Sequence, residues 1–174
     1  ILILIVGVVL AIRQIIDWRV PVVYLGTIFV LTAVVAAITG IESYHGIPAV
    51  IWYPLLHILT GGVIFGAVFM LTDPVTSPTS ASGRVVFAMG AAIITTLIRL
   101  KANLPEGCLY SILLMNMFTP WIESCFDGKQ LDLVKKSRIV CACLALIGLA
   151  ISFYAASSIQ KVDTVPETAA VVET

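Results

Sequence analysis

Long apolar segments separated by short charged loops constrain the fold of this chain more than any other feature. A helix needs roughly 20 apolar residues to cross the hydrocarbon core of a bilayer. Segments at 21–38, 49–71, 85–100, 108–126 and 139–159 approach or reach that length, and a further apolar segment, 1–12, begins the chain. Charged residues make up 11% of the sequence, against about a quarter in soluble domains. We therefore expect an all-α, polytopic bundle embedded in a lipid bilayer.

The distribution of lysine and arginine predicts how the loops face the membrane, because basic residues are retained on the cytoplasmic side. Four of them lie in the loop at 127–138 and two in the loop at 13–19, while the loop at 40–48 has none. Each apolar segment carries the chain from one side of the membrane to the other. Counting the segments between these loops therefore places 13–19, 72–84 and 127–138 on the cytoplasmic side. The loops 40–48 and 101–107 and the C-terminal tail are then expected outside.

Three regions are distinguished by composition. Residues 1–126 form the main membrane region, 127–159 a charged loop with an additional spanning helix, and 160–174 a polar tail that we expect to be disordered. The first residues carry neither a methionine nor a basic signal region, so we interpret the chain as the C-terminal part of a longer protein. The formal net charge of zero does not favour a nucleic-acid partner.

A polar hinge follows the apolar segment 49–71 at Thr72-Asp73-Pro74. Pro74 ends the helix, so the Asp73 carboxylate is expected beside the helix C-terminus, where the exposed carbonyls disfavour an anion. Such a carboxylate needs a partner, which could be Arg84, a bound cation or a backbone N–H. The hydroxyls of Thr72 and Thr76 would complete an oxygen-rich shell suited to Na⁺. The alternative is a turn anchored by local hydrogen bonds.

Other polar residues stand out against their apolar surroundings. Asn116 lies deep in the apolar segment 108–126, where it must find a hydrogen-bond partner. Pro120 suggests a break in the helix formed by that segment. Asn103 and Glu106 precede the same segment, where Glu106 would either cap the helix or take part in function. Gly62 and Gly66 lie four residues apart and indicate close helix packing. No motif for hydrolysis or metal binding is present, so we assign neither a catalytic residue nor a metal ligand.

Three stretches of the sequence carry a family resemblance over roughly residues 13–126. They are IIDWRVPVVYLGTIFVLT, FGAVFMLTDPVTSPTSASGR and LIRLKANLPEGCLYSILLMNMFTPWIE. Together they resemble the RnfD/NqrB family, which includes the D subunit of the Rnf ion-translocating ferredoxin:NAD⁺ oxidoreductases and the B subunit of the Na⁺-translocating NADH:quinone reductase.

The resemblance implies a fold of two five-helix repeats, similar to urea and ammonium channels, with this chain supplying most of the second repeat. It also implies a flavin mononucleotide, FMN, esterified to a threonine in an S-G-A-T-like motif, with riboflavin as a second candidate cofactor. Ser82-Gly83 is followed here by Arg84, so the attachment threonine is expected upstream of this chain. Asn103 and Glu106 are expected on the side where the family holds its flavin. The helix at 139–159 is an addition to the family pattern.

The function implied is that of a membrane subunit of a redox-driven Na⁺ or H⁺ pump in a bacterial inner membrane, working with the other subunits of an Rnf-type complex. Thr72, Asp73, Thr76 and Asn116 are the residues predicted to form an ion route. Two alternatives stay open from the sequence. One is a passive channel or secondary transporter for a small solute, and the other is a scaffold for partner subunits.

Overall fold

The computed structural model describes residues 2–40, 47–102, 106–126 and 130–158. All elements in these ranges are helices, which confirms the expected fold class. They are α1 (Leu2–Ile12), α2 (Arg19–Thr39), α3 (Ala49–Leu59), α4 (Val63–Phe65), the π-helical turn η1 (Gly66–Met70), α5 (Ala81–Lys101), α6 (Gly107–Cys125) and α7 (Gln130–Ser158).

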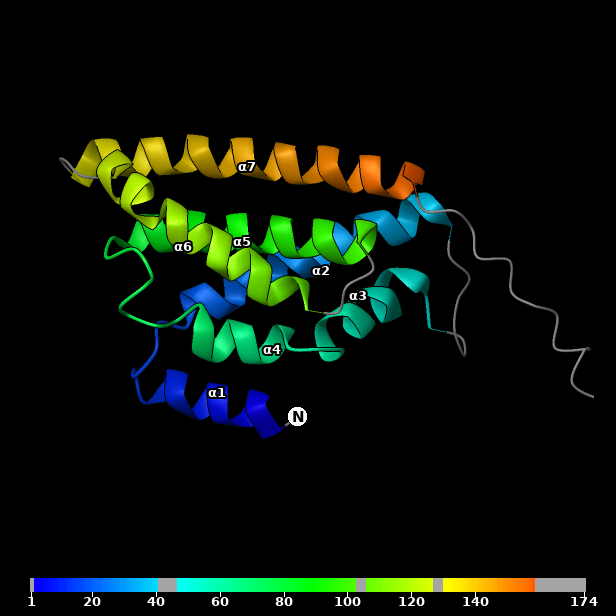
Figure 1. Cartoon of the computed structure of the whole chain (residues 1–174), viewed down its shortest axis with the longest axis horizontal. Helices are drawn as coiled ribbons and strands as arrows, with labels where there is room; N and C mark the ends of the chain where they lie inside the picture. Colours follow the sequence, from blue (N-terminus) through cyan, green and yellow to red (C-terminus); the bar gives the residue numbers. More distant parts are fainter. Residues whose placement is uncertain (1, 41–46, 103–105, 127–129, 159–174) are drawn as a thin grey trace, which may run out of the picture.

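Successive helices run back and forth, so that the connections gather at two ends of the bundle (Figure 1). The segments 13–18 and 71–80 and the end of α6 lie at one end, while the end of α2, the start of α3 and the start of α6 lie at the other. This grouping agrees with the one expected from the basic residues. Which end faces the cytoplasm stays a prediction.

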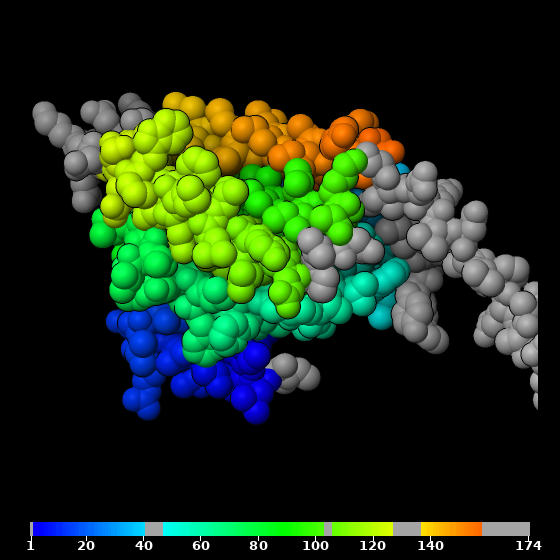
Figure 2. Space-filling view, in the orientation of Figure 1, coloured from blue at the N-terminus to red at the C-terminus, as the bar shows by residue number. Residues whose placement is uncertain are grey.

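Helices α2 and α5 form the centre of the bundle. They pack against each other, α7 packs against both, and α6 packs against α5 and η1. Figure 2 shows α6 lying across the visible face, with α7 on one side of the molecule and α1 on the other. Large apolar side chains are exposed on these outer helices, among them Met117, Trp121 and Phe153. Such a surface suits a lipid environment.

Three described helices are long and apolar enough to cross a membrane: α2, α5 and residues 137–157 of α7. The pair formed by α3 and residues 63–70 adds a fourth if it counts as one span, and α1 is a shorter apolar helix. α6 is 19 residues long but is not among these spans. Polar residues such as Asn116 and Glu123 lower the mean hydropathy of α6. The span predicted at 108–126 is therefore a helix that packs in the bundle but is less apolar than the three candidate spans.

The third predicted span is not one continuous helix. α3 ends at Leu59, and the chain bends by 71° before residues 63–70 continue. Gly61 at the bend has a φ of +71°, a left-handed conformation that glycine adopts without the cost of a Cβ. Gly61 is therefore a turn residue, and Gly62, which precedes α4, packs against nothing within 4 Å of a Cβ position.

Gly66 makes the close approach that its spacing predicted. A Cβ on Gly66 would lie 2.3 Å from Cys108 Sγ in α6, so only glycine lets the two helices pack this tightly. The backbone at this point is π-helical, since the Leu71 N–H donates to Gly66 O, five residues back, at 2.8 Å. The turn sets the direction in which the chain reaches the polar hinge, and such turns occur frequently at functional sites.

Pro120 does not break α6. The helix runs through it from Gly107 to Cys125, so the expected break is wrong. Proline removes one backbone donor and tends to kink a helix, but here the surrounding turns continue on both sides. The small residues of α5 hold α6 close by: a Cβ on Gly90 would lie 2.7 Å from Met115 Cε.

Candidate functional site

A cavity of about 660 Å³ opens at the end of the bundle that carries the polar hinge. Thr72, Asp73, Thr76 and Asn116, the four residues predicted to form an ion route, all line it. Folding thus brings the hinge together with a side chain of α6 that is distant in the sequence. The other walls are apolar and come from α1 and the following loop, from η1, from the hinge and from α6: Leu10, Ile15, Ile16, Val68, Phe69, Met70, Pro74 and Ile112.

Thr72 and Asp73 lie where η1 ends. The Thr72 hydroxyl donates to Val68 O, one turn back, and leaves its oxygen lone pairs available. Asp73 Oδ1 accepts from the Val75 N–H at 3.2 Å, and Asp73 O accepts from the Ser77 N–H at 3.1 Å. These are the local bonds of a turn, so the alternative raised by the sequence is present in the structure. A turn bond to one carboxylate oxygen does not prevent the carboxylate from facing the cavity.

Asn116 reaches the cavity from α6. Its Oδ1 is shielded from solvent and accepts no hydrogen bond from any described residue. A shielded carbonyl oxygen without a donor costs free energy unless water or an ion satisfies it. Asp73, Thr72 and Thr76 line the cavity and carry oxygen atoms, the ligand type that hard cations such as Na⁺ prefer. Rotation of the Asn116 amide toward the cavity would add its Oδ1 to this set.

Arg84 does not pair with Asp73, which corrects one of the partners expected from the sequence. Its Nη1 donates to Asp17 Oδ2 at 2.9 Å, its Nε to Pro78 O at 3.0 Å and its Nη2 to Thr79 O at 3.1 Å. The guanidinium is planar with several donors in fixed directions, and it therefore binds the hinge backbone and the loop before α2 at the same time. Arg84 holds the hinge in place instead of neutralising Asp73.

Two residues of α6 hold the hinge from the other side. Glu123 Oε1 accepts from the Thr79 N–H at 2.9 Å and from the Thr79 hydroxyl at 3.0 Å, and the Thr119 hydroxyl donates to Thr76 O at 3.0 Å. Sequence reasoning missed Asp17, Thr119 and Glu123 in this role. For Asp17 a signal existed, because its loop was predicted on the same side of the membrane as the hinge.

Asn103 and Glu106 are the two residues expected near a flavin. Asn103 lies outside the described residues. Glu106 is exposed, directly precedes α6, and its side chain makes no capping hydrogen bond to the helix. Glu106 lines neither the hinge cavity nor the cavity between α2, α5 and α7, so its expected position near a flavin stays a prediction.

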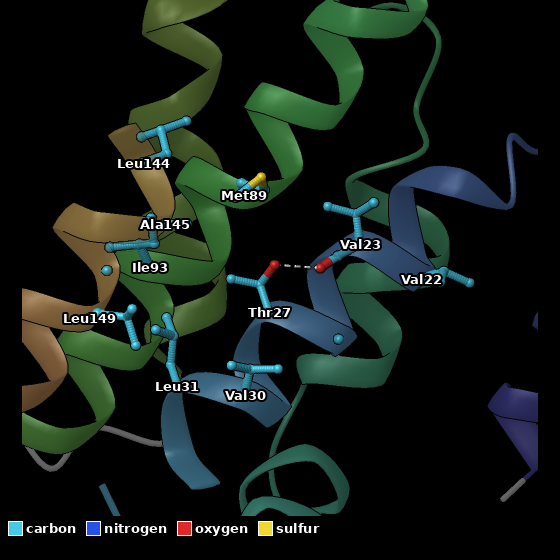
Figure 3. Close-up of a pocket in the computed structure, with 12 residues that line it drawn as sticks. Val22, Val23, Thr27, Val30, Leu31, Met89, Ile93, Leu144, Ala145 and Leu149 are labelled. Carbon is cyan, nitrogen blue, oxygen red and sulfur yellow. Dashed lines mark hydrogen bonds between the residues drawn. The ribbon is translucent and has the colours of Figure 1, made fainter. Parts of the chain in front are cut away.

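A second cavity, of about 390 Å³, lies between α2, α5 and α7 (Figure 3). Its lining is aliphatic apart from Met89 and Thr27, and the Thr27 hydroxyl is used within its own helix, donating to Val23 O at 2.7 Å. The cavity therefore offers a ligand dispersion contacts only. It carries no group that would orient a substrate or bind an ion.

Comparison with known proteins gives a family match over most of the chain. A model of the family described as NQR2, RnfD, RnfE matches residues 1–132, so most of α7 lies beyond the matched region. The D subunit of the proton-translocating ferredoxin:NAD(+) oxidoreductase complex of Clostridium ljungdahlii is 44% identical over 117 residues, which is 67% of this chain and 33% of that protein.

Two further relatives give similar values. The D subunit of the Na(+)-translocating ferredoxin:NAD(+) oxidoreductase complex of Acetobacterium woodii is 44% identical over 117 residues, covering 67% of this chain and 32% of that protein. The D subunit of the ion-translocating oxidoreductase complex of Halorhodospira halophila is 39% identical over 118 residues, covering 67% of this chain and 30% of that protein. The chain spans about a third of the length of these curated relatives.

Proposed function

Because the chain belongs to the NQR2, RnfD, RnfE family, we propose that it is part of a membrane subunit of a redox-driven ion pump. Similar relatives are named as D subunits of ion-translocating oxidoreductase complexes, which supports this proposal. The protein then belongs to a multi-subunit Rnf-type translocase in a bacterial cell membrane. Electrons pass through FMN held by the full-length subunit on a threonine outside this chain.

The observation that carries the proposal is the cavity at the hinge. Asp73 and Asn116 come from distant parts of the chain, yet both line it, together with Thr72 and Thr76. Asp73 lies in the hinge at the end of the bundle, where the negative charge of a carboxylate attracts cations toward the cavity. In this proposal the Asp73 carboxylate provides the charge that attracts the cation, and the Asn116 Oδ1 and the threonine hydroxyls replace part of its hydration shell.

The transported ion is Na⁺ or H⁺ in this proposal. The relatives named as proton-translocating and Na⁺-translocating are equally identical to this chain, so identity favours neither ion. A proton needs only a titratable group such as Asp73, whereas Na⁺ needs several oxygen ligands at once. The unpaired acceptor of Asn116 could serve as one of the Na⁺ ligands or bind a water molecule on a proton route.

The substitution Asp73→Asn tests the proposal in the full-length subunit, assembled with its partner subunits and reconstituted in vesicles. We expect the complex to assemble, since amide and carboxylate have nearly the same shape, while electron-driven ion uptake falls about tenfold or more through loss of a charged ligand. The control is Ser77→Ala, because Ser77 belongs to the same hinge but does not line the cavity.

Other outcomes favour other functions. Ion or solute flux that needs no electron donor would favour a passive channel. Uptake unchanged by Asp73→Asn would show that the hinge is structural and that the subunit serves as a scaffold. The flavin part is checked separately, by fluorescence of the full-length subunit on a denaturing gel, where only a covalently bound flavin survives.

A further inference from the structure

The break between α3 and α4 leaves backbone carbonyls without helical partners at the point where the chain bends by 71°. The last carbonyls of any helix have no N–H to accept from, and they give the helix end a partial negative charge. Here the Thr60 N–H still bonds Leu56 O at 2.9 Å, but the turn at Gly61 then diverts the chain. The carbonyls of His57 and Thr60 are left for another donor.

Arg99 of α5 supplies that donor. Its Nη1 donates to His57 O, and its Nη2 donates to Thr60 O at 2.8 Å. The side chain is only 7% exposed, so a full positive charge is held against the end of a half-helix with little access to water. A buried charge is tolerated only where polar partners replace its hydration. The two carbonyls are such partners.

The interior next to Arg99 is also polar. Thr95 lies one helical turn before Arg99 on α5 and is fully buried. Its hydroxyl lies 2.9 Å from the Tyr24 hydroxyl and 2.6 Å from the Ser111 hydroxyl, and the Tyr24 hydroxyl donates to Cys108 Sγ at 3.1 Å. These four side chains form a buried polar cluster one helical turn from Arg99. The guanidinium itself donates to the carbonyls of His57 and Thr60.

We propose that the break between α3 and α4 is a cation site that the chain fills with its own Arg99 guanidinium. Broken membrane helices commonly use unwound carbonyls to coordinate a free cation. In this chain the same kind of oxygen atoms receive a tethered, planar cation instead. The ligand class of the site is a small planar cation, and the site is independent of the ion route proposed at the hinge cavity.

The test removes the Arg99 side chain by substitution and then adds free guanidinium ion to the solution. In the full-length subunit within its purified complex, Arg99→Ala is expected to lower the thermal midpoint. Low-millimolar guanidinium chloride should then recover much of the loss in a saturable way, while the wild-type complex shows no such recovery. Urea has nearly the same planar shape without the charge and should have no effect. A response to urea equal to that of guanidinium, or no saturable response at all, would overturn the proposal.

Arg84→Ala is the matched control, because Arg84 also donates to two backbone carbonyls but is a third exposed. Water replaces it, so guanidinium should not restore stability saturably. If Arg99→Ala does not assemble, Arg99→Lys and Arg99→Gln decide the question. The lysine variant keeps the charge and should be the more stable of the two. Equal stability would show that the break does not require a cation, and would also overturn the proposal.

Discussion

Asn116 illustrates how much one buried atom can indicate. A shielded acceptor without a donor costs about 1–3 kcal/mol relative to a satisfied one, and nothing in the described residues offsets this cost at Asn116 Oδ1. A purely structural asparagine at this position would be less favourable than an apolar residue. Asn116 lines the cavity, and rotation of its amide toward the cavity would let an ion or water there satisfy the oxygen.

The substitution Asn116→Leu distinguishes a role of Asn116 in packing from a role in binding the transported ion. Because it removes the unpaired polar atom and keeps the approximate size, we expect the thermal midpoint of the complex to stay the same or rise. The initial rate of electron-driven ion uptake into vesicles should fall several-fold, because a ligand of the cation is lost. The two measurements are made on the same preparation.

Met117→Leu serves as the control, because Met117 is in the same helix but 81% exposed and does not line the cavity. It should change neither quantity. A loss of stability in Asn116→Leu with unchanged transport would contradict the proposed role and make Asn116 a packing residue.

Among the helices, the contact between η1 and α6 depends on Gly66. A Cβ there meets Cys108 Sγ at 2.3 Å and Ile112 Cδ1 at 3.4 Å. Cys108 Sγ accepts the hydrogen bond of the Tyr24 hydroxyl, so it cannot rotate away without losing that bond. The tight packing and the buried polar cluster are therefore coupled.

Gly66→Ala is expected to destabilise the complex by about 1–3 kcal/mol, the usual cost of overpacking a tight contact. Combining it with Cys108→Ala should recover part of this loss, because the clashing sulfur is gone. Thermal midpoints of the wild-type protein, the two single variants and the double variant measure the coupling. Gly62→Ala is the control and should be tolerated, since nothing lies within 4 Å of its Cβ position. Equal effects at Gly62 and Gly66 would contradict the packing argument.

Across the bundle as a whole, contacts at one end tie the loops together. The Arg84–Asp17 pair joins the hinge to the loop before α2, and the Thr79–Glu123 bonds join it to the end of α6. Both side chains of the ion pair are partly exposed, so the pair itself contributes about 0–1 kcal/mol. Its main effect is geometric, because it fixes the hinge that carries Asp73.

This grouping predicts which loops are accessible from each side of the membrane. Val75 is 86% exposed in the hinge, and Glu106 is exposed at the opposite end. In intact cells a membrane-impermeant maleimide should label Glu106→Cys but not Val75→Cys, and in inverted vesicles the pattern should reverse. The unsubstituted protein gives the background from its own cysteines. Labelling of both variants from the same side would contradict the arrangement.

Amino-acid order alone was sufficient to predict an all-helical membrane protein. Without water, backbone polar groups must be satisfied within each helix, so apolar length indicates the fold class. The order of residues also singled out Thr72, Asp73, Thr76 and Asn116, because polar groups are conspicuous in apolar surroundings and must gather where they find partners. Their shared cavity agrees with this reasoning.

Which groups meet could be learned only from the folded chain. Arg84 reaches Asp17 and the hinge carbonyls instead of Asp73, and Arg99 binds carbonyls about 40 positions away in the sequence. The break at Gly61 and the continuity of α6 through Pro120 likewise depend on packing. Local sequence sets only a preference for turning or continuing at such positions. The contacts that outweigh that preference come from other helices, and sequence spacing does not reveal them.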